Sequence, residues 1–469
     1  MRKYNFTNYE KTAYFNQNIY FQNFEEKLVD KAKKDIQEEF EKIDLRIRYD
    51  KKRIACGWQI KDYRYRKIKT LYGDVSFLRT RYWNKFTKEV KVLVDQEIPI
   101  EKYQRIIPNL KIEILNRVGR GNRYCDIVDC LRNSKISEQT ISNVVKRFNI
   151  AKDTIEDLRG KKIDVSNKEY IYIETDDTFS NFIKDNKKTN FRIRIATIHT
   201  GARRGIHNRK YLENKKIDYM LIEKGKRIST LDYSKRIKVF INNHYKNYEN
   251  KQLVILGDNA TWINNLAYEL GGFYVLDKYH LIKKLSSVFP YNNRNRFICE
   301  KWKKPFLYIK TSILKGLSYN YVLDALNEVF LWLESNNEKE KLREFIKFIS
   351  FIKRNSSAIK NYYKKFDSSS HTEGQVSSFV KQTLGYGKKI YGFKTFSNLL
   401  KIKQIHANGY DMCELLEYEI ETLQINNLDY IYKEVIEYKT IGLLWKDKKS
   451  DISTKGSWAK IKQPGFKRV

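Results

Sequence analysis

Residues 252–264, QLVILGDNATWIN, constrain the fold of this chain more than any other stretch. The four apolar residues at 253–256 are too few for a helix and lack polar alternation, which is typical of a strand buried on both faces of a sheet. Gly257 ends the strand, and Asp258 follows where the strand gives way to a helix. Open α/β sheets usually bind ligands beyond the carboxyl end of such a strand. An aspartate followed by Thr261 and an apolar run is also an ordinary helix start, so Asp258 could instead be a helix cap.

The charge of the chain indicates a polyanionic partner. Its 469 residues hold 92 Lys plus Arg against 56 Asp plus Glu, a formal net charge of +36. Because such a field attracts polyanions and speeds their encounter, we expect nucleic acid as the partner. An AT-rich coding genome would also raise the lysine content and would explain part of this charge without any function. No apolar run approaches the roughly 20 residues that span a membrane, and the first residues hold no secretory core, so we expect a cytoplasmic protein with no membrane contact.

Residues 1–110 are predicted to form a helix and β-hairpin region. Apolar residues at helical spacing among charged neighbours predict one long amphipathic helix over residues 21–48. Residues 66–83 change to a period of two around Gly73, which predicts a basic hairpin or a pair of short strands. The hairpin could contact phosphate, although an ordinary small sheet would show the same pattern.

Residues 111–160 show the pattern of a helix-turn-helix. An apolar helical run is broken by GRGN at 119–122, a short helix follows, and SKISEQTISNVVKRF then begins another helix with Ser137 as its N-cap. In a helix-turn-helix the second helix lies in the major groove, where Gln and Asn can bond adenine and Lys and Arg can reach guanine or phosphate. A plain three-helix bundle would show the same spacing. The predicted DNA-binding residues are Ser137, Gln139, Thr140, Asn143, Lys146 and Arg147.

Strands alternate with helices over residues 168–289, which predicts an α/β fold with helices on the faces of a sheet. The strand EYIYIETDDTF at 169–179 ends in Asp176 and Asp177, and another strand follows at 191–201. After Asp258 the chain repeats the step with a helix at 261–270, a strand at 273–277 and a helix at 279–285.

The rest of the chain is predicted to be helical, then basic. Residues 290–366 show helical apolar spacing throughout, which predicts an all-helical domain inserted into the α/β unit. Residues 367–425 return to that unit with a helix that Ser369 or Ser370 could cap and that carries Glu373 in its first turn. Residues 426–469 are a basic tail.

Three separated acids suit a site for two metal ions. Phosphodiester cleavage and strand transfer use two divalent cations about 4 Å apart, and Mg²⁺ prefers carboxylate and phosphate oxygens. Asp176 and Asp258 are expected at strand ends of one sheet, and Glu373 on a helix that returns after the insertion. Taken alone, Glu373 would be an ordinary first-turn acid that interacts with the helix dipole.

Four motifs resemble the DDE transposase-like family of mycoplasma integrative conjugative elements and related insertion sequences of low-GC bacteria: IETDD, VILGDNATWI, YVLDKYHLIKKL and TEGQVSSFVKQTLG. The resemblance spans about residues 20–405. It implies a ribonuclease-H-like core, interrupted by a helical domain before its last acid, with two Mg²⁺ or Mn²⁺ ions as cofactor. By position it places the catalytic, metal-holding acids on Asp176, Asp258 and Glu373.

The resemblance departs from the family pattern at two places. Asn259 stands where the family more often has Gly, and Asp177 could replace Asp176 as the first acid. Asp277 and His280, in DKYH, are possible accessory residues that could hold the site or touch DNA, or could only form a hydrogen bond at a helix start.

Together these features predict a DNA transposase of a mobile element, which cuts and joins double-stranded DNA at element ends and acts as a homo-oligomer on DNA. Attack by water would be followed by attack by a 3′-hydroxyl. Two alternatives stay open: a DNA-binding regulatory or architectural protein with an inactive nuclease core, and a metal-dependent nuclease without strand transfer.

Overall fold

The computed structural model describes residues 8–98, 100, 103–149, 162–205, 210–290, 300–364, 366, 371–385 and 389–417. Its contacts divide the chain into two units, Met1–Thr154 with Asp411–Val469, and Ile155–Tyr410. This division is coarser than the six regions expected from the sequence, whose boundaries stay predictions. The basic tail, the expected caps Ser369 and Ser370, and residues 418–425 lie outside the described residues.

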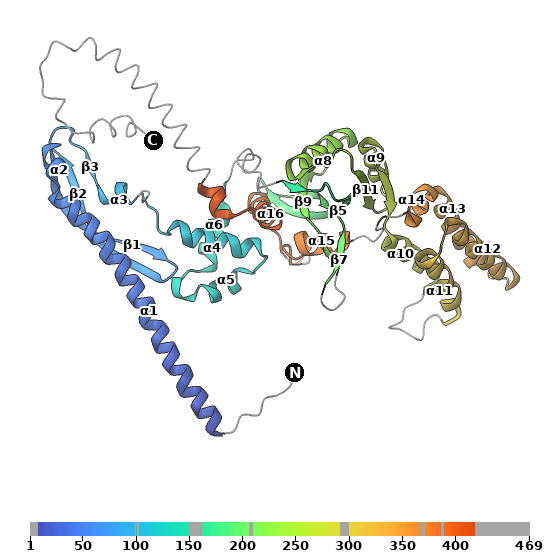
Figure 1. Cartoon of the computed structure of the whole chain (residues 1–469), viewed down its shortest axis with the longest axis horizontal. Coiled ribbons are helices and arrows are strands. Elements are labelled where there is room, and N and C mark those ends of the chain that lie inside the picture. The colour runs from blue at the N-terminus through green and yellow to red at the C-terminus, as the bar shows by residue number, and fades with distance from the viewer. Residues whose placement is uncertain are drawn as a thin grey trace, which may run out of the picture. The chain divides into compact units, whose positions relative to one another are not determined.

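In the first unit, a β-hairpin packs along one long helix (Figure 1). Helix α1 spans Asn8–Tyr49, which confirms the predicted helix and begins it earlier. Strands β1 (Trp58–Thr70) and β2 (Gly73–Asn84) form the predicted hairpin, and Gly73 turns it with a φ of 131° that other residues rarely adopt. The hairpin and α1 are joined through the buried carboxylate of Asp44 on α1, which accepts hydrogen bonds from the backbone N–H and the hydroxyl of Thr80. Three short elements complete this part: α2 (Lys51–Ala55), β3 (Val90–Lys91) and α3 (Val94–Glu97).

The predicted helix-turn-helix region also forms helices. Helices α4 (Pro108–Gly119), α5 (Tyr124–Cys130) and α6 (Glu138–Arg147) follow one another, with a 3₁₀ turn at Arg132–Ser134. Ser137 caps α6 as expected, because its hydroxyl accepts the backbone N–H of Thr140 at 3.2 Å. Ile141 and Val145 are fully buried, so α6 turns the expected face inward.

The second unit is built on a five-stranded mixed sheet in the order β12-β11-β5-β6-β9. Strands β5 (Tyr170–Lys184), β6 (Lys187–His199) and β9 (Lys216–Glu223) are antiparallel neighbours. Strand β11 (Gln252–Gly257) is parallel to β5 and to the edge strand β12 (Phe273–Leu276). Strand β11 is paired on both edges, and Val254, Ile255 and Leu256 are completely buried, as the apolar run predicted, whereas Leu253 is partly buried. The fold is therefore mixed α/β.

The predicted end of the first strand is wrong. Strand β5 continues to Lys184 and turns directly into β6 through Asp185 and Asn186, whose φ angles are 49° and 59°. Asp and Asn tolerate this left-handed conformation, so the two residues close a tight hairpin. Asp176 and Asp177 consequently lie inside a strand and not at its end.

Helices cover both faces of the sheet (Figure 1). Helices α8 (Thr230–His244) and α9 (Thr261–Leu270) share one apolar core with the strands and with α10 (Lys278–Val288). Helix α15 (Thr372–Val376), the π-helical turn η4 (Ser377–Lys381) and α16 (Phe393–Ala407) contribute to a second core on the opposite face. Two small ribbons, β4 (Ile163–Asp164) with β10 (Tyr245–Lys246) and β7 (Ala202–Arg204) with β8 (Lys210–Leu212), lie at the margins.

The chain between α10 and α15 is helical, as predicted, wherever it is described. It forms α11 (Glu300–Lys315), α12 (Tyr319–Ser335), α13 (Lys339–Arg354), α14 (Ser356–Lys360) and a 3₁₀ turn at Asn361–Tyr363. This insertion continues the core of the sheet, because its Phe345 and Phe348 belong to the same buried cluster as Leu285 of α10. Its end is tied to β12, since the hydroxyl of Tyr362 donates to the carbonyl of Leu276 at 2.6 Å.

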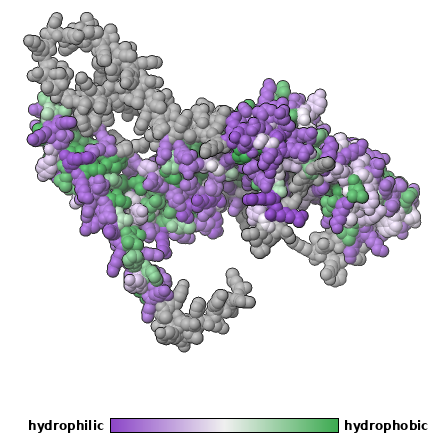
Figure 2. Space-filling view, in the orientation of Figure 1, coloured by the Kyte–Doolittle hydropathy of each residue, from purple (hydrophilic) through white to green (hydrophobic). Residues whose placement is uncertain are grey.

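The exposed surface is more apolar along α1 than over most of the second unit. Figure 2 shows apolar side chains along α1, where Phe21, Phe24 and Leu28 are each at least 50% exposed, while most of the visible surface of the second unit is hydrophilic. No helix within the described ranges is both long and apolar enough to cross a lipid bilayer.

Candidate functional site

Asp176, within β5, lies close to Asp258, which directly follows the neighbouring parallel strand β11. The register pairs Leu256 of β11 with Glu174 of β5, and the charge of Asp258 acts on Asp176, so the two carboxylates are neighbours. Adjacent strands lie about 4.8 Å apart. Strands β5 and β11 can approach closely here because residue 257 is a glycine. An added Cβ at this position would lie 2.5 Å from Ile263 Cδ1 and 3.1 Å from the carbonyl oxygen of Thr175. The structure thus brings together two of the three predicted acids.

The two carboxylates share an electrostatic environment that resists a second negative charge. Burial raises the pKa of Asp176 to about 6; the charge of Asp258 adds to the rise, whereas the backbone N–H of Asp177 and His280 oppose it. Asp176 Oδ1 accepts the N–H of Asp177 and Asp258 Oδ1 accepts the N–H of Ala260. The second oxygen of each carboxylate has no hydrogen-bond partner among the described residues. Two half-buried, crowded carboxylates with free oxygens are a suitable donor set for a divalent cation.

Asp177 points to the other face of β5. Arg194 of β6 holds it with two hydrogen bonds, Nε to Oδ1 at 2.8 Å and Nη2 to Oδ2 at 2.9 Å. The Arg194 guanidinium also lies 3.4 Å from the ring centre of Trp262 on α9. Asp177 is therefore half of a structural ion pair, which leaves Asp176 as the acid on the face of α15.

The helix-start interpretations of Asp258 and Asp277 are partly right. The N-cap of α9 is Ala260 and not Asp258, but the Asp258 carboxylate does accept the Ala260 N–H at 2.9 Å. Asp277 is the N-cap of α10, since its Oδ1 accepts the N–H of Tyr279 at 2.9 Å. His280 lies one turn into α10, with its Nε2 3.9 Å from Asp277 Oδ2, and it acts electrostatically on Asp176. His280 thus lies near Asp277 and Asp176.

Glu373 lies in the first turn of α15, which packs against β5 and β6. Its carboxylate is half-exposed and pairs with Lys381 Nζ at 3.3 Å. Within the described ranges, no set of three or more His, Cys, Asp or Glu side chains is arranged to hold a metal ion. The helix of the third predicted acid lies on the face of the sheet to which Asp176 points, whereas the Glu373 side chain pairs with Lys381.

Glu174 is a site residue that the sequence interpretation missed. It is completely buried two residues before Asp176, on the same face of β5. Its Oε2 accepts the backbone N–H of His371 at 2.8 Å, and its Oε1 lies 3.2 Å from His371 Nδ1 and 3.3 Å from His199 Nε2. Burial would raise the pKa of Glu174, but hydrogen bonds with His199 and His371 lower it to about 2. An acid within an apolar strand run, IYIET, was the available signal for such a buried contact.

These contacts latch the beginning of α15 onto β5, and a second anchor holds the segment after it. His371 is the N-cap residue of α15, so Glu174 fixes the turn that carries Glu373. After α15 the backbone widens into the π-helical turn η4, and Lys403 of α16 donates to the carbonyls of Ser378 at 2.8 Å and Phe379 at 3.2 Å. Burial lowers the pKa of Lys403 to about 8. π-helical turns are frequent at functional sites.

The predicted DNA-binding helix α6 presents a polar outer surface. Ser137, Gln139, Asn143, Lys146 and Arg147 are exposed, and Thr140 is partly exposed. Gln139 Nε2 donates to Asn143 Oδ1 at 2.9 Å, so the two amides form one unit on the helix surface. This arrangement agrees with the expected outer face and does not by itself establish DNA contact.

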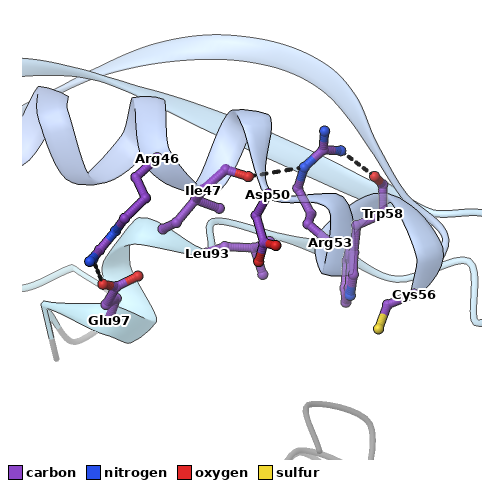
Figure 3. Close-up of a pocket in the computed structure, with 8 residues that line it drawn as sticks. All are labelled: Arg46, Ile47, Asp50, Arg53, Cys56, Trp58, Leu93 and Glu97. Carbon is purple, nitrogen blue, oxygen red and sulfur yellow. Dashed lines mark hydrogen bonds and ion pairs between the residues drawn. The ribbon is translucent and has the colours of Figure 1, made fainter. Parts of the chain in front are cut away.

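A cavity of about 350 Å³ in the first unit has a structural explanation (Figure 3). Arg53 lines it and donates to the carbonyls of Ile47 at 3.1 Å, Arg48 at 2.7 Å and Trp58, which ties the end of α1 to β1. Arg46 and Glu97 form an ion pair at its other side. Asp50, which also lines the cavity, accepts the backbone N–H of Lys52 at 2.8 Å, so each of these charged side chains already has a partner.

Comparison with known proteins identifies relatives over most of the chain. Three UPF0236 proteins of Caldanaerobacter subterraneus subsp. tengcongensis are 24–25% identical over 381 residues, which is 80% of this chain and 70–74% of theirs. The name of one of them joins eleven loci of that bacterium. Two solved structures, the Mos1 transposase paired-end complex with left transposon end and the Mos1 strand transfer complex, match 58% and 56% of this chain and 87% and 80% of theirs. Their sequence identities are 11% and 12%, and the TM-score is 0.15 for both. The sequence model of the uncharacterised protein family UPF0236 matches residues 15–385, and this chain therefore belongs to that family.

Proposed function

We propose that this protein is a metal-dependent DNA strand-cleaving and strand-joining enzyme, a transposase of the DDE type, with Asp176 and Asp258 at its centre. The observation that carries the proposal is the proximity of Asp176, within β5, to Asp258, which directly follows the adjacent parallel strand β11, with the pKa of Asp176 raised to about 6. A carboxylate with a perturbed pKa, close to a second acid that follows the carboxyl end of a parallel strand, is typical of functional sites. The mixed sheet with a helical insertion before α15 supports the ribonuclease-H-like core that the motifs imply.

The residues of the site would have two roles: some would bind the metal ions, and others would set the charge and position of those that do. When Mg²⁺ or Mn²⁺ ions are bound, they supply activation of the attacking oxygen and stabilisation of the leaving oxygen. The free oxygens of Asp176 and Asp258 would hold them, once Asp176 has lost its proton. His280 favours the charged form of Asp176. Asp177 is not needed for this role, because Arg194 occupies both of its oxygens.

Glu373 completes the site by exchanging its partner. Its ion pair with Lys381 joins two side chains that are 44% and 41% exposed, and pairs of this kind contribute about 0–1 kcal/mol. Breaking the pair is therefore cheap, and α15 already lies on the face to which Asp176 points. We propose that Glu373 turns from Lys381 toward the two aspartates when metal and DNA are bound.

Charge and relatives support DNA as the substrate of a mobile element. A net charge of +36 favours binding of any nucleic acid, and α6 exposes amides and cations suited to base edges and phosphates. One relative is named for eleven loci, which is what a gene that multiplies within a genome produces. We propose that the protein holds two element ends as a homo-oligomer.

The test uses DNA that flanks the gene on either side as the candidate element end. With Mn²⁺, the purified full chain is expected to nick this duplex and to join the released 3′ end to a target plasmid, and Asp258→Asn is expected to abolish both products while keeping DNA affinity. Equal product from the wild type and from Asp258→Asn would overturn the assignment. Nicking without joining would identify the nuclease alternative.

A DNA-binding protein without metal chemistry is the second candidate. It is favoured by the pairing of Glu373 with Lys381 and by the lack, in the described part of the chain, of three acids already gathered around one point. Retained DNA binding with no metal-dependent product from any flanking sequence would establish this alternative.

A further inference from the structure

We propose that a polar hollow next to Asp258 binds the phosphodiester backbone of the nucleic-acid strand that enters the site, an inference that rests on the proposed function. The hollow has a volume of about 260 Å³ and lies between the start of α9 and the end of α13 of the helical insertion. Its lining includes Asn259, Asn264, Tyr274, Lys284, Phe351 and Arg354.

Its position connects it with the candidate site. Asn259 directly follows Asp258, and Tyr274 donates its hydroxyl to the carbonyl of Asp258 at 2.6 Å. A strand whose reacting phosphate lies at Asp258 therefore has a neighbouring phosphate within reach of the hollow. The insertion supplies the opposite wall through Phe351 and Arg354.

The charge of the lining selects an anion. Lys284 and Arg354 are its ionisable side chains apart from the Tyr274 phenol, and its lining includes no carboxylate. Neither cation forms an ion pair with a carboxylate in the part of the chain that the structure describes. Lys284 Nζ lies 4.1 Å from the ring centre of Phe351, and Arg354 Nε donates to the carbonyl of Ser350 at 3.3 Å. Both side chains are thus oriented by contacts that leave their positive charge uncompensated.

The size of the hollow and the uncharged amide side chains in its lining favour part of a strand over a free small molecule. Pockets that enclose whole small ligands measure about 300–1,000 Å³, whereas 260 Å³ suits one phosphate and its sugar. Asn259 and Asn264 are exposed at the rim, and side-chain amides commonly hydrogen-bond to phosphate and sugar oxygens. The geometry points to sequence-independent positioning of the strand, with specificity supplied elsewhere.

The experiment compares two double variants of the full chain that lose the same charge from the same two helices. Lys284→Gln with Arg354→Gln removes the cations of the hollow, whereas Lys283→Gln with Arg343→Gln removes exposed cations of α10 and α13 outside its lining. The dissociation constant of a fluorescent duplex is measured by anisotropy at several salt concentrations, without divalent metal. Each phosphate contact contributes about 0.9 to the slope of log affinity against log salt. Because the hollow would hold one phosphate, the first variant is expected to reduce the slope by about 1.

The control variant is expected to keep the slope, and Lys284→Arg with Arg354→Lys, which retains both charges, is expected to restore it. Equal loss in the two glutamine variants, or no loss in the first, would overturn the proposal. Mononucleotide binding is measured in the same way. If the first glutamine variant loses mononucleotide binding but keeps duplex binding, the hollow is a small-molecule site, and the proposal is overturned. Because no metal is present, this binding measurement is independent of the cleavage test. A protein that binds DNA without cutting it would still show the expected loss of salt dependence.

Discussion

Replacing Glu174 by Gln is expected to release α15 from the sheet. The carboxylate of Glu174 accepts the backbone N–H of His371 on one oxygen and faces His371 Nδ1 and His199 Nε2 with the other. A glutamine keeps the shape but carries no charge, and only one of its two terminal atoms can accept a hydrogen bond inside this fully buried site. The variant therefore loses the charge that strengthens the hydrogen bond with the backbone N–H of His371.

The pKa of Glu174 sets the size of the effect. Hydrogen bonds overcome the burial penalty and lower this pKa from 4.5 to about 2, which corresponds to about 3 kcal/mol of stability at neutral pH. Because the folded-state pKa is the lower one, this contribution is complete above pH 4.5 and is lost as the pH falls toward 2. In the variant, the opening free energy of α15 should fall by about 3 kcal/mol, or about a hundredfold in rate.

Hydrogen–deuterium exchange of the full chain at pH 7 measures this directly. Backbone amides in residues 371–381 are expected to exchange about a hundred times faster in Glu174→Gln, whereas those of α9 keep their rate. Glu169→Gln, which changes an exposed carboxylate just before the same strand, is the matched control and should leave both segments unchanged. An unchanged exchange rate of α15 in Glu174→Gln would show that Glu174 does not hold α15 on the sheet.

Three further predictions concern other parts of the molecule. Arg194→Met should lower the thermal midpoint of the second unit by several degrees, because removing one member of a buried ion pair costs about 3–5 kcal/mol and leaves Asp177 with only the more distant Arg192, whose Nε lies 3.7 Å from Asp177 Oδ2. A midpoint equal to that of the wild type would contradict the structural role of the Asp177–Arg194 pair. Mn²⁺ affinity, measured by titration calorimetry between pH 5 and 8, should rise with pH and level off above about 7, since the ion competes with the proton on Asp176, whose pKa is about 6; a flat profile would exclude Asp176 as a ligand. Lys146→Ala, assayed by anisotropy, should weaken binding to all duplexes and reduce the slope of log affinity against log salt by about 1. Gln139→Ala should instead reduce the difference in affinity between specific and random DNA. No effect from either variant would show that α6 does not contact DNA.

Local sequence signals predicted those parts of the fold whose cause is local. Ser137 capped α6 because a hydroxyl at that position meets the free N–H groups of the first turn. The apolar run at 253–256 formed β11, because a parallel strand whose two faces are both covered by helices is apolar on both faces. The helices between α10 and α15 were predicted from the helical spacing of their apolar residues, which lets one side of each helix pack into the core.

The parts that could not be predicted depend on long-range pairing. Nothing in the neighbourhood of Asp176 shows that β5 continues to Lys184, since this depends on the antiparallel partner β6. The choice between Asp176 and Asp177 was open in the sequence, and it was the register with Arg194 that separated their environments. Glu174 was missed because its partners, His199 and His371, are 25 and 197 residues away.

The most direct test of the central claim, that Asp176 and Asp258 together hold a divalent cation, is the count of Mn²⁺ bound to the full chain by electron paramagnetic resonance at pH 7.5. We expect tight binding by the wild type and by Asp185→Asn, an exposed aspartate in the β5–β6 turn. We expect loss of that binding in both Asp176→Asn and Asp258→Asn. Wild-type binding in either of these two variants would contradict the account.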